Sequence, residues 1–252
     1  MLVLNVKSEL ITETIGDKTL PILDVSGLKA GYGSKPVVFD ASFQVRPGEV
    51  IGIIGHNGAG KSTTLSAVYG SLKPTGGQVK YHDQIISGRS PRKNVREGMT
   101  LLRSERFTFG ELSVRENLLL GGLFVKTSER DARLSEIYDL FPILKEREHA
   151  HAQQFSGGQQ RLLSIGMALV SSPKVMLLDE PSLGIAPALT AKIFDTIKQL
   201  TVERNIAVVI VEQNLKELLR IAERIYVMRS GRVILEESAE KMSQRASLWD
   251  LF

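Results

Sequence analysis

The stretch VIGIIGHNGAGKST, residues 50–63, joins a short apolar run to a glycine-rich loop. The apolar run predicts a buried strand, and KSTTLSAVYGSL, which begins at the lysine of the loop, predicts a helix. From Gly55 to Ser62 the loop matches the pattern G-x-x-x-x-G-K-[ST] in full. Glycines let such a loop curl until successive backbone N–H groups point inward at the N-terminus of a helix, where they bind phosphate. The sequence therefore predicts a phosphate-binding loop between a strand and a helix.

The side chains of this loop have separate predicted tasks. Lys61 is expected to reach the β- and γ-phosphates of a nucleotide, and the hydroxyl of Ser62 to ligate Mg²⁺. Thr63 can add a further contact to phosphate. The other residues expected to contact the nucleotide are Gly55, His56, Asn57, Gly58, Ala59 and Gly60.

A second motif, VMLLDE at residues 175–180, supplies the carboxylates that this chemistry needs. Asp179 ends an apolar strand, where it can hold Mg²⁺ through water. Glu180 follows directly and is placed to orient or deprotonate an attacking water. The two motifs together predict a bound nucleotide with Mg²⁺ as its metal, and Lys61 and Glu180 as the residues that act on its phosphates.

A third motif, FSGGQQR at residues 155–161, opens an apolar helix. Ser156 with Gln159 three residues later forms a capping box, which on its own indicates only a well-capped helix. Its place between the other two motifs raises the question of whether the cap also has a ligand.

The order of elements indicates an α/β fold with a mainly parallel sheet, because strands alternate with helices. Residues 22–33 and 37–45 read as half-buried strands of an N-terminal antiparallel β subdomain, and RIYVMRSGRVILE, residues 224–236, reads as a hairpin. Residues 85–160 read as a mainly helical insert, with capping boxes expected at Ser113–Glu116 and Ser128–Asp131. The expected divisions are an arm over 1–21, an ATPase domain over 22–236 and a tail over 237–252.

Composition narrows the class of protein further. The chain has 252 residues, a net charge of +4 and no cysteine, so disulfides and thiolate metal sites are excluded. Its apolar runs are far shorter than the roughly 20 residues that cross a bilayer, and its start lacks the pattern of a signal peptide. The four histidines have no metal-ligand spacing, and the mild charge does not select nucleic acid.

GHNGAGKS, FSGGQQR and VMLLDEP, in that order, resemble the ATPase domains of the ABC family over about residues 22–236. The resemblance implies a P-loop NTPase core in which two copies pair head to tail around ATP. The phosphate loop of one copy and the Ser-Gly-Gly helix start of the other then enclose each nucleotide. The residues that would contact ATP bound to the partner copy are Ser156, Gly157, Gly158 and Gln159.

The resemblance also assigns positions outside the three motifs. Tyr32 lies where these ATPases place an aromatic ring against adenine. Gln213, expected as a third catalytic residue, stands where most members have a histidine that touches the γ-phosphate; its amide can donate to phosphate but cannot titrate. Ala186 replaces the usual interface aspartate, and the usual glutamine that reaches Mg²⁺ and water falls at Ser104 or Glu105.

The segments SVRENLLLGG, EPSLGIAP and VEQN resemble the ATPase subunits of branched-chain amino-acid importers. A similar branch serves urea or short-chain amides. The resemblance implies transmembrane permease subunits, a second ATPase chain and, indirectly, an extracytoplasmic solute-binding protein as partners, at the cytoplasmic face of the membrane and without nucleic acid. The alternatives are a soluble ABC-type ATPase switch, usually built from two cassettes or a long coiled coil, and a P-loop kinase with an acceptor site.

Overall fold

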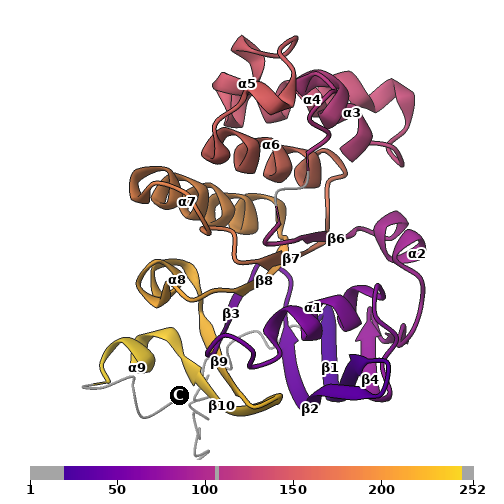
Figure 1. Ribbon diagram of the computed structural model, residues 1–252, viewed down its shortest axis with the longest axis vertical. Coiled ribbons are helices and arrows are strands. Elements are labelled where there is room, and N and C mark those ends of the chain that lie inside the picture. The colour runs from indigo at the N-terminus through magenta and orange to yellow at the C-terminus, as the bar shows by residue number, and fades with distance from the viewer. Residues whose placement is uncertain (1–19, 106–107, 246–252) are drawn as a thin grey trace, which may run out of the picture.

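The computed structural model describes residues 20–105 and 108–245. Figure 1 shows a sheet running through the lower and middle parts of the molecule, with a separate group of helices above it. The strands are β1 (Leu23–Tyr32), β2 (Lys35–Val45), β3 (Val50–Ile54), β4 (Gly76–Tyr81), β5 (Gln84–Ile85), β6 (Met99–Leu102), β7 (Val175–Asp179), β8 (Ala207–Val211), β9 (Arg224–Arg229) and β10 (Arg232–Ser238). The helices are α1 (Lys61–Tyr69), α2 (Pro91–Arg96), α3 (Val114–Gly121), α4 (Thr127–Leu140), α5 (Pro142–Glu146), α6 (Gly157–Val170), α7 (Pro187–Arg204), α8 (Leu215–Ile221) and α9 (Ala239–Ser243).

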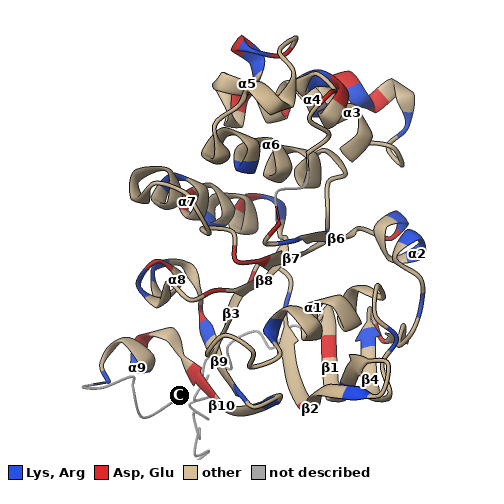
Figure 2. Ribbon diagram, viewed as in Figure 1, with Lys and Arg blue, Asp and Glu red and all other residues tan. Residues whose placement is uncertain are grey.

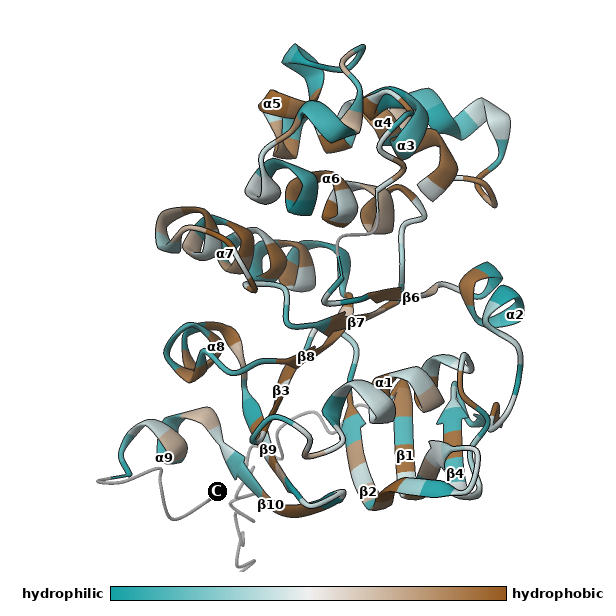
Figure 3. Cartoon of the chain, in the orientation of Figure 1, coloured by the Kyte–Doolittle hydropathy of each residue, from teal (hydrophilic) through white to brown (hydrophobic). Residues whose placement is uncertain are grey.

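The sheet has the strand order β5-β4-β1-β2-β10-β9-β3-β8-β7-β6. Strand β3 pairs in parallel with β8 and β9, and β7 pairs in parallel with β8 and β6. Every residue of β3, β7 and β8 is buried, because helices cover both faces of this part of the sheet. Figure 3 shows these strands as a mainly brown, hydrophobic centre. Parallel pairing brings the carboxyl ends of β3, β7 and β8 to one edge, where ligands bind in open α/β sheets.

The antiparallel strand pairs lie near the start and near the end of the described sequence, as expected. Strand β1 pairs with β2 and β4, and β9 pairs with β10 through a turn at Ser230 and Gly231, both with positive φ. The amide of Gly231 donates to the carbonyl oxygen of Ala59 at 2.9 Å. The hairpin turn therefore braces the glycine-rich loop from the outside.

The stretch over residues 85–160 is less uniformly helical than its sequence indicated. Strand β6 lies within it and extends the parallel sheet beside β7. Four apolar or hydroxyl residues, MTLL, make a strand too short for periodicity to separate it from a helix segment. The helices above the sheet are α3, α4, α5 and the body of α6, which pack into one core with the helical side of the sheet.

The two capping boxes expected in this stretch have different outcomes. At α3 the box of Ser113 with Glu116 is present, and its prediction is confirmed. At α4 the prediction is wrong, because Lys126 is the N-cap and no side chain caps the helix, so Ser128 is already inside the first turn. Arg130 donates to the carbonyl oxygen of Val125 at 3.1 Å, which ties the preceding loop to this earlier start.

The terminal segments lie largely outside the described residues. This applies to residues 1–19 of the expected arm and to Trp249 and Phe252 of the expected tail. Within residues 20–105 and 108–245, no helix has both the length and the apolar character that a membrane crossing requires.

Candidate nucleotide-binding and hydrolysis site

The glycine-rich loop connects β3 to α1 at the carboxyl edge of the sheet, as its sequence predicts. Gly60 has φ of +102°, a conformation that side chains with a Cβ rarely adopt. A Cβ on Gly55 would lie 2.2 Å from the carbonyl oxygen of Met228 in β9. The loop can therefore curl and approach β9 only with glycine at both positions.

Lys61 is the first residue of α1, and its side chain is buried. Its Nζ donates to the carbonyl oxygens of Gly55 at 2.8 Å and His56 at 3.1 Å, so the ammonium spans the mouth of the loop. Burial lowers the pKa of Lys61, while the negative charges of Glu180 and Asp179 oppose that shift. The ammonium is thus placed to neutralise phosphate oxygens held by the loop.

Ser62 meets Asp179 although 117 positions separate them in the sequence. The Ser62 hydroxyl donates to Oδ1 of Asp179 at 2.9 Å. Burial raises the pKa of Asp179, and the hydrogen bond from Ser62 opposes that shift. Oxygen atoms of a hydroxyl and a carboxylate are ligands that Mg²⁺ accepts. Among the described residues no group of three or more His, Cys, Asp or Glu could hold a metal, so further ligands would come from phosphate and water.

Glu180 follows β7 with φ of +46°, an uncommon conformation for a residue other than glycine. Its backbone N–H donates to the carbonyl oxygen of Val211 in β8 at 2.8 Å. Its Oε1 accepts a hydrogen bond of 2.7 Å from the side-chain amide of Gln213. The two residues predicted to act on the γ-phosphate end of the nucleotide are therefore direct partners.

The helix start at residues 156–159 has the predicted capping box. Ser156 Oγ accepts from the amide of Gln159 at 3.3 Å, and Oε1 of Gln159 accepts from the amide of Ser156 at 3.0 Å. Ser156 is exposed, and a Cβ on Gly158 would lie 2.7 Å from a methyl group of Leu189. Figure 1 places α6 in the upper group of helices and α1 in the lower half. One chain does not bring this helix start to its own phosphate loop.

The remaining sequence-predicted positions lie at the ends of other elements. Tyr32 ends β1 with 57% of its surface exposed. Ala186 is the N-cap of α7 and offers no side-chain cap. Ser104 and Glu105 directly follow Arg103, just after β6.

Two buried charged residues belong to this site and were given no role from the sequence. Arg161 of α6 and Glu212, which follows β8, are each 2% exposed. Both hydrogen-bond the chain around Glu180, as described below. Two features of the sequence could have indicated them: Arg161 is a charged residue inside an apolar helix, and Glu212 is a carboxylate directly after an apolar strand. Figure 2 shows acidic residues near the ends of β7 and β8.

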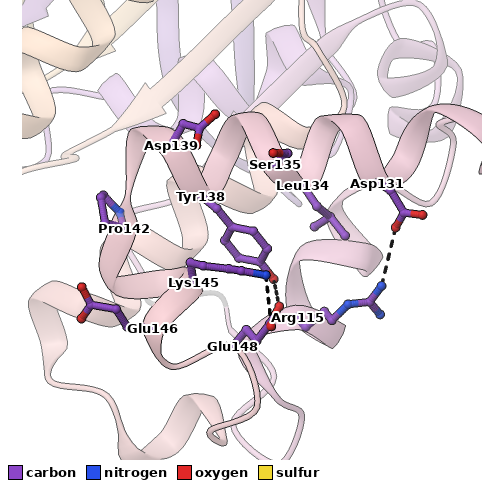
Figure 4. A pocket seen from close by; sticks show the side chains of 10 residues that line it. All are labelled: Arg115, Asp131, Leu134, Ser135, Tyr138, Asp139, Pro142, Lys145, Glu146 and Glu148. Atoms are coloured by element: carbon purple, nitrogen blue, oxygen red, sulfur yellow. Dashed lines mark hydrogen bonds and ion pairs between the residues drawn. The ribbon is translucent and has the colours of Figure 1, made fainter.

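The helical part carries a groove of its own, drawn in Figure 4, with a volume of about 650 Å³. Tyr138 donates to Glu148 at 3.0 Å, and Lys145 donates to the same carboxylate at 3.2 Å. Arg115 lies 3.6 Å from Asp131 across the groove. None of the sequence-predicted site residues lines this groove, and these charged groups are paired with one another.

The loop, the buried aspartate that meets its serine and the glutamate after it place the molecule among P-loop nucleotide-binding proteins. Residues 38–183 match the family model described as ABC transporter, which covers more than half of the chain. The chain belongs to the ABC transporter family of ATP-binding proteins.

Relatives within this family match nearly the whole chain. The high-affinity branched-chain amino acid transport ATP-binding protein BraG of Pseudomonas aeruginosa is 37% identical over 221 residues, covering 88% of this chain and 94% of BraG. LivG of Escherichia coli K12, with the same description, is 32% identical over 238 residues, covering 88% and 93%. The crystal structure of MJ1267, an ATP-binding cassette of an ABC transporter in its ADP conformation, has a TM-score of 0.81 at 28% identity, covering 92% and 98%.

Proposed function

We propose that this chain binds and hydrolyses ATP to power a membrane importer for branched-chain or other hydrophobic amino acids. The observation that carries the proposal is the 2.9 Å contact between Ser62 and Asp179, with Glu180 next in the chain. This contact joins the phosphate-binding loop to the segment that carries Glu180, the residue proposed to act on water. The names of BraG and LivG support the class of solute, and uptake of urea or short-chain amides is the alternative within the same architecture.

The residues of the chain divide the hydrolytic work. The loop amides and Lys61 hold the phosphates, while Ser62 and Asp179 would hold Mg²⁺. Bound Mg²⁺ would neutralise charge on the phosphate oxygens. Glu180 orients a water toward the γ-phosphate and accepts its proton, with its carboxylate held by Gln213.

A second ATPase chain completes the site in this proposal. The exposed Ser156 hydroxyl and the N-terminus of α6 suit a phosphate, because free N–H groups and the helix dipole favour an anion there. The separation of α6 from the loop in Figure 1 supports a ligand held by a partner copy. The partner is either the same chain or a related one, arranged head to tail.

The permease subunits need a surface on which to dock. A cavity of about 270 Å³ lies between the core and the helical part, and its lining includes Tyr69, Val95, Arg103, Gly121 and Met167. Next in sequence to Gly121, which lines the cavity, the end of α3 and the turn after it expose the apolar side chains of Leu120, Leu123 and Phe124. Exposed apolar side chains beside a cavity suit a helix of a membrane partner better than solvent. We assign the permease contact, at the cytoplasmic face of the membrane, to this surface.

Affinity capture of the tagged chain from detergent-solubilised membranes tests the proposal. We expect polytopic membrane proteins to be recovered, with or without a second ATPase and a solute-binding protein. Phe124→Asp should lose them, whereas Ile234→Asp, an exposed apolar residue of β10, should keep them. Recovery of soluble proteins alone would contradict the transporter function and favour a nucleotide-dependent switch.

A further inference from the structure

Two buried charges surround the turn that carries Glu180 without taking part in the proposed chemistry. Arg161 projects from the first turns of α6, and Glu212 follows the last residue of β8. Both side chains are 2% exposed. Burial of a charge is costly unless the group is fully hydrogen-bonded, so each must have its partners inside the protein.

Among residues 20–105 and 108–245, the acceptors of the Arg161 guanidinium are backbone carbonyl groups. Three of them are consecutive, at the end of β7 and in the turn after it, and the fourth belongs to the residue directly after β6. The acceptors are Asp179 at 3.0 Å, Glu180 at 2.8 Å, Pro181 at 3.1 Å and Arg103 at 2.6 Å. The side chain thus connects the helix α6, the turn of Glu180 and the start of the segment that leads into the helical part.

The carboxylate of Glu212 holds the other end of the same turn. Its Oε1 accepts from the backbone N–H of Ser182 at 2.8 Å. Its Oε2 accepts from the backbone N–H of Gln213 at 3.0 Å and Asn214 at 3.3 Å. One buried acid therefore fixes the backbone on both sides of the hydrogen bond between Glu180 and Gln213.

The two charges also support each other electrostatically. Burial lowers the pKa of Arg161 to about 10, while the negative charge of Glu212 favours the charged form. The guanidinium is therefore charged near neutral pH. A charged, planar fork with five donors can satisfy several carbonyl groups at once, which a lysine ammonium cannot do in the same geometry.

We propose that Arg161 and Glu212 are positioning residues that hold the backbone of residues 179–182 so that Glu180 faces Gln213. The proposal rests on the function proposed above, because it assigns these residues to ATP hydrolysis. Arg161 also hydrogen-bonds Arg103, which lines the cavity proposed for docking, and it projects from the helix α6, whose N-terminus is proposed to face the partner's nucleotide. The turn that carries Glu180 is thereby joined to both proposed partner surfaces through one side chain.

A purely structural role makes a different prediction from a positioning role. A structural ion pair affects the fraction of folded protein and leaves the turnover of each folded chain unchanged. A positioning pair lowers kcat while ATP affinity stays nearly constant, since the loop and Lys61 that bind ATP are not held by it. The separation of kcat from ATP affinity therefore distinguishes the two roles.

The experiment compares Arg161→Lys and Glu212→Gln with Arg224→Lys and Glu49→Gln. Arg224 and Glu49 form a matched, largely buried ion pair with contacts of 2.7 and 3.0 Å, between β9 and the turn before β3. For the full-length purified chain, we measure the fraction folded, the Kd of ATP and the kcat of ATP hydrolysis. We expect at least about a tenfold loss of kcat in the first pair with Kd changed less than about threefold, and unchanged kcat in the control pair.

Two results would overturn the proposal. One is a kcat in Arg161→Lys and Glu212→Gln within twofold of the wild type, and the other is an equal loss in the control pair. Glu212→Gln keeps the shape of the side chain, so it decides the question alone if Arg161→Lys does not fold. The wild-type rate, measured with the second ATPase chain present, separates the hypotheses: an inactive wild type under that condition contradicts the proposed function, whereas an active wild type with active variants contradicts only the positioning role.

Discussion

The side-chain amide of Gln213 donates a hydrogen bond of 2.7 Å to Oε1 of Glu180, across the ends of the neighbouring strands β8 and β7. Glu180 adopts an uncommon backbone conformation, and its own N–H is tied to Val211 of β8. The carboxylate that is proposed to activate water therefore has its orientation set from the adjacent strand. An amide performs this task without gaining or losing a proton.

Gln213→Ala should lower kcat about tenfold, because a hydrogen bond to a charged group contributes roughly 1.5–3 kcal/mol and solvent replaces part of it. Gln213→Glu should be worse, since it sets a second carboxylate against Glu180. Gln199→Ala is the matched control, because Gln199 donates to Glu203 at 2.7 Å on the exposed side of α7. Steady-state ATPase assays of the three variants check this, and equal rates for Gln213→Ala and Gln199→Ala would refute it.

Ser156→Ala should affect both stability and activity, whereas Ser113→Ala should affect stability alone. Both serines cap helices through capping boxes, so each change should cost about 1 kcal/mol of unfolding free energy. Only Ser156 is proposed to contact ATP held by the partner chain. Denaturant unfolding and ATP-dependent dimer formation, measured by light scattering, test the pair. Equal ATP-dependent dimer formation by both variants would remove Ser156 from the proposed site.

The raised pKa of Asp179 should make the stability of the protein depend on pH, and Mg²⁺ should reverse the direction of that dependence. Because burial raises its pKa above the ordinary value of 3.8, protonated Asp179 adds stability at low pH, and this contribution is lost as the pH rises through the raised pKa. Asp179→Asn should therefore raise the Tm of the metal-free protein at pH 7.5, and the difference should shrink toward pH 4.

Binding of Mg²⁺ requires the carboxylate form of Asp179. With Mg²⁺ bound, stability should therefore increase with pH instead of decreasing. The increase in Tm caused by adding Mg²⁺ to the ATP-bound protein should grow with pH in the wild type and be absent in Asp179→Asn. Thermal unfolding, monitored by fluorescence, measures this increase in variants that also carry Glu180→Gln, so that ATP is not hydrolysed. A full Mg²⁺-dependent increase in Asp179→Asn would show that the residue does not hold the metal.

Tyr32→Ala should weaken ATP binding by roughly fivefold, because stacking of a base on an aromatic ring contributes about 1 kcal/mol at an exposed position. Tyr32→Phe should bind within twofold of the wild type, since phenylalanine keeps the ring face. Stability should change by less than about 0.5 kcal/mol, because the side chain is mostly exposed. Isothermal titration with ATP decides the matter, and unchanged affinity in Tyr32→Ala would place adenine elsewhere.

The parts of the fold that local chemistry determines were predictable from the sequence. The loop before α1, the capping box at Ser156 and the hairpin turn at Ser230 follow from residue types within a few positions. Strand β6 was missed because four residues carry no period, and its place depends on β7, which is more than seventy residues away. The start of α4 was misplaced because the helix begins at Thr127 without a side-chain cap, and the contact of Arg130 with Val125, five residues earlier, carries no capping signal.

The roles of Arg161 and Glu212 could not be predicted from sequence patterns, for a different reason. Arg161 and Glu212 bind backbone groups 18 to 58 and 1 to 30 positions away, and backbone groups leave no signature in the residue types. The contact of Ser62 with Asp179 was predictable because each belongs to a motif with a known chemical partner. Long-range contacts are therefore predictable where both ends are side chains with defined chemistry.

The most direct test of the account is ATP hydrolysis by the purified chain and its Glu180→Gln variant, with ATP binding measured in parallel. The account predicts that Glu180→Gln binds ATP as the wild type does, accumulates as an ATP-bound dimer and hydrolyses ATP at least about a hundredfold more slowly, since general-base catalysis contributes roughly 10²–10⁴ to such a rate. Hydrolysis by Glu180→Gln at the wild-type rate would contradict the central claim that this carboxylate activates the attacking water.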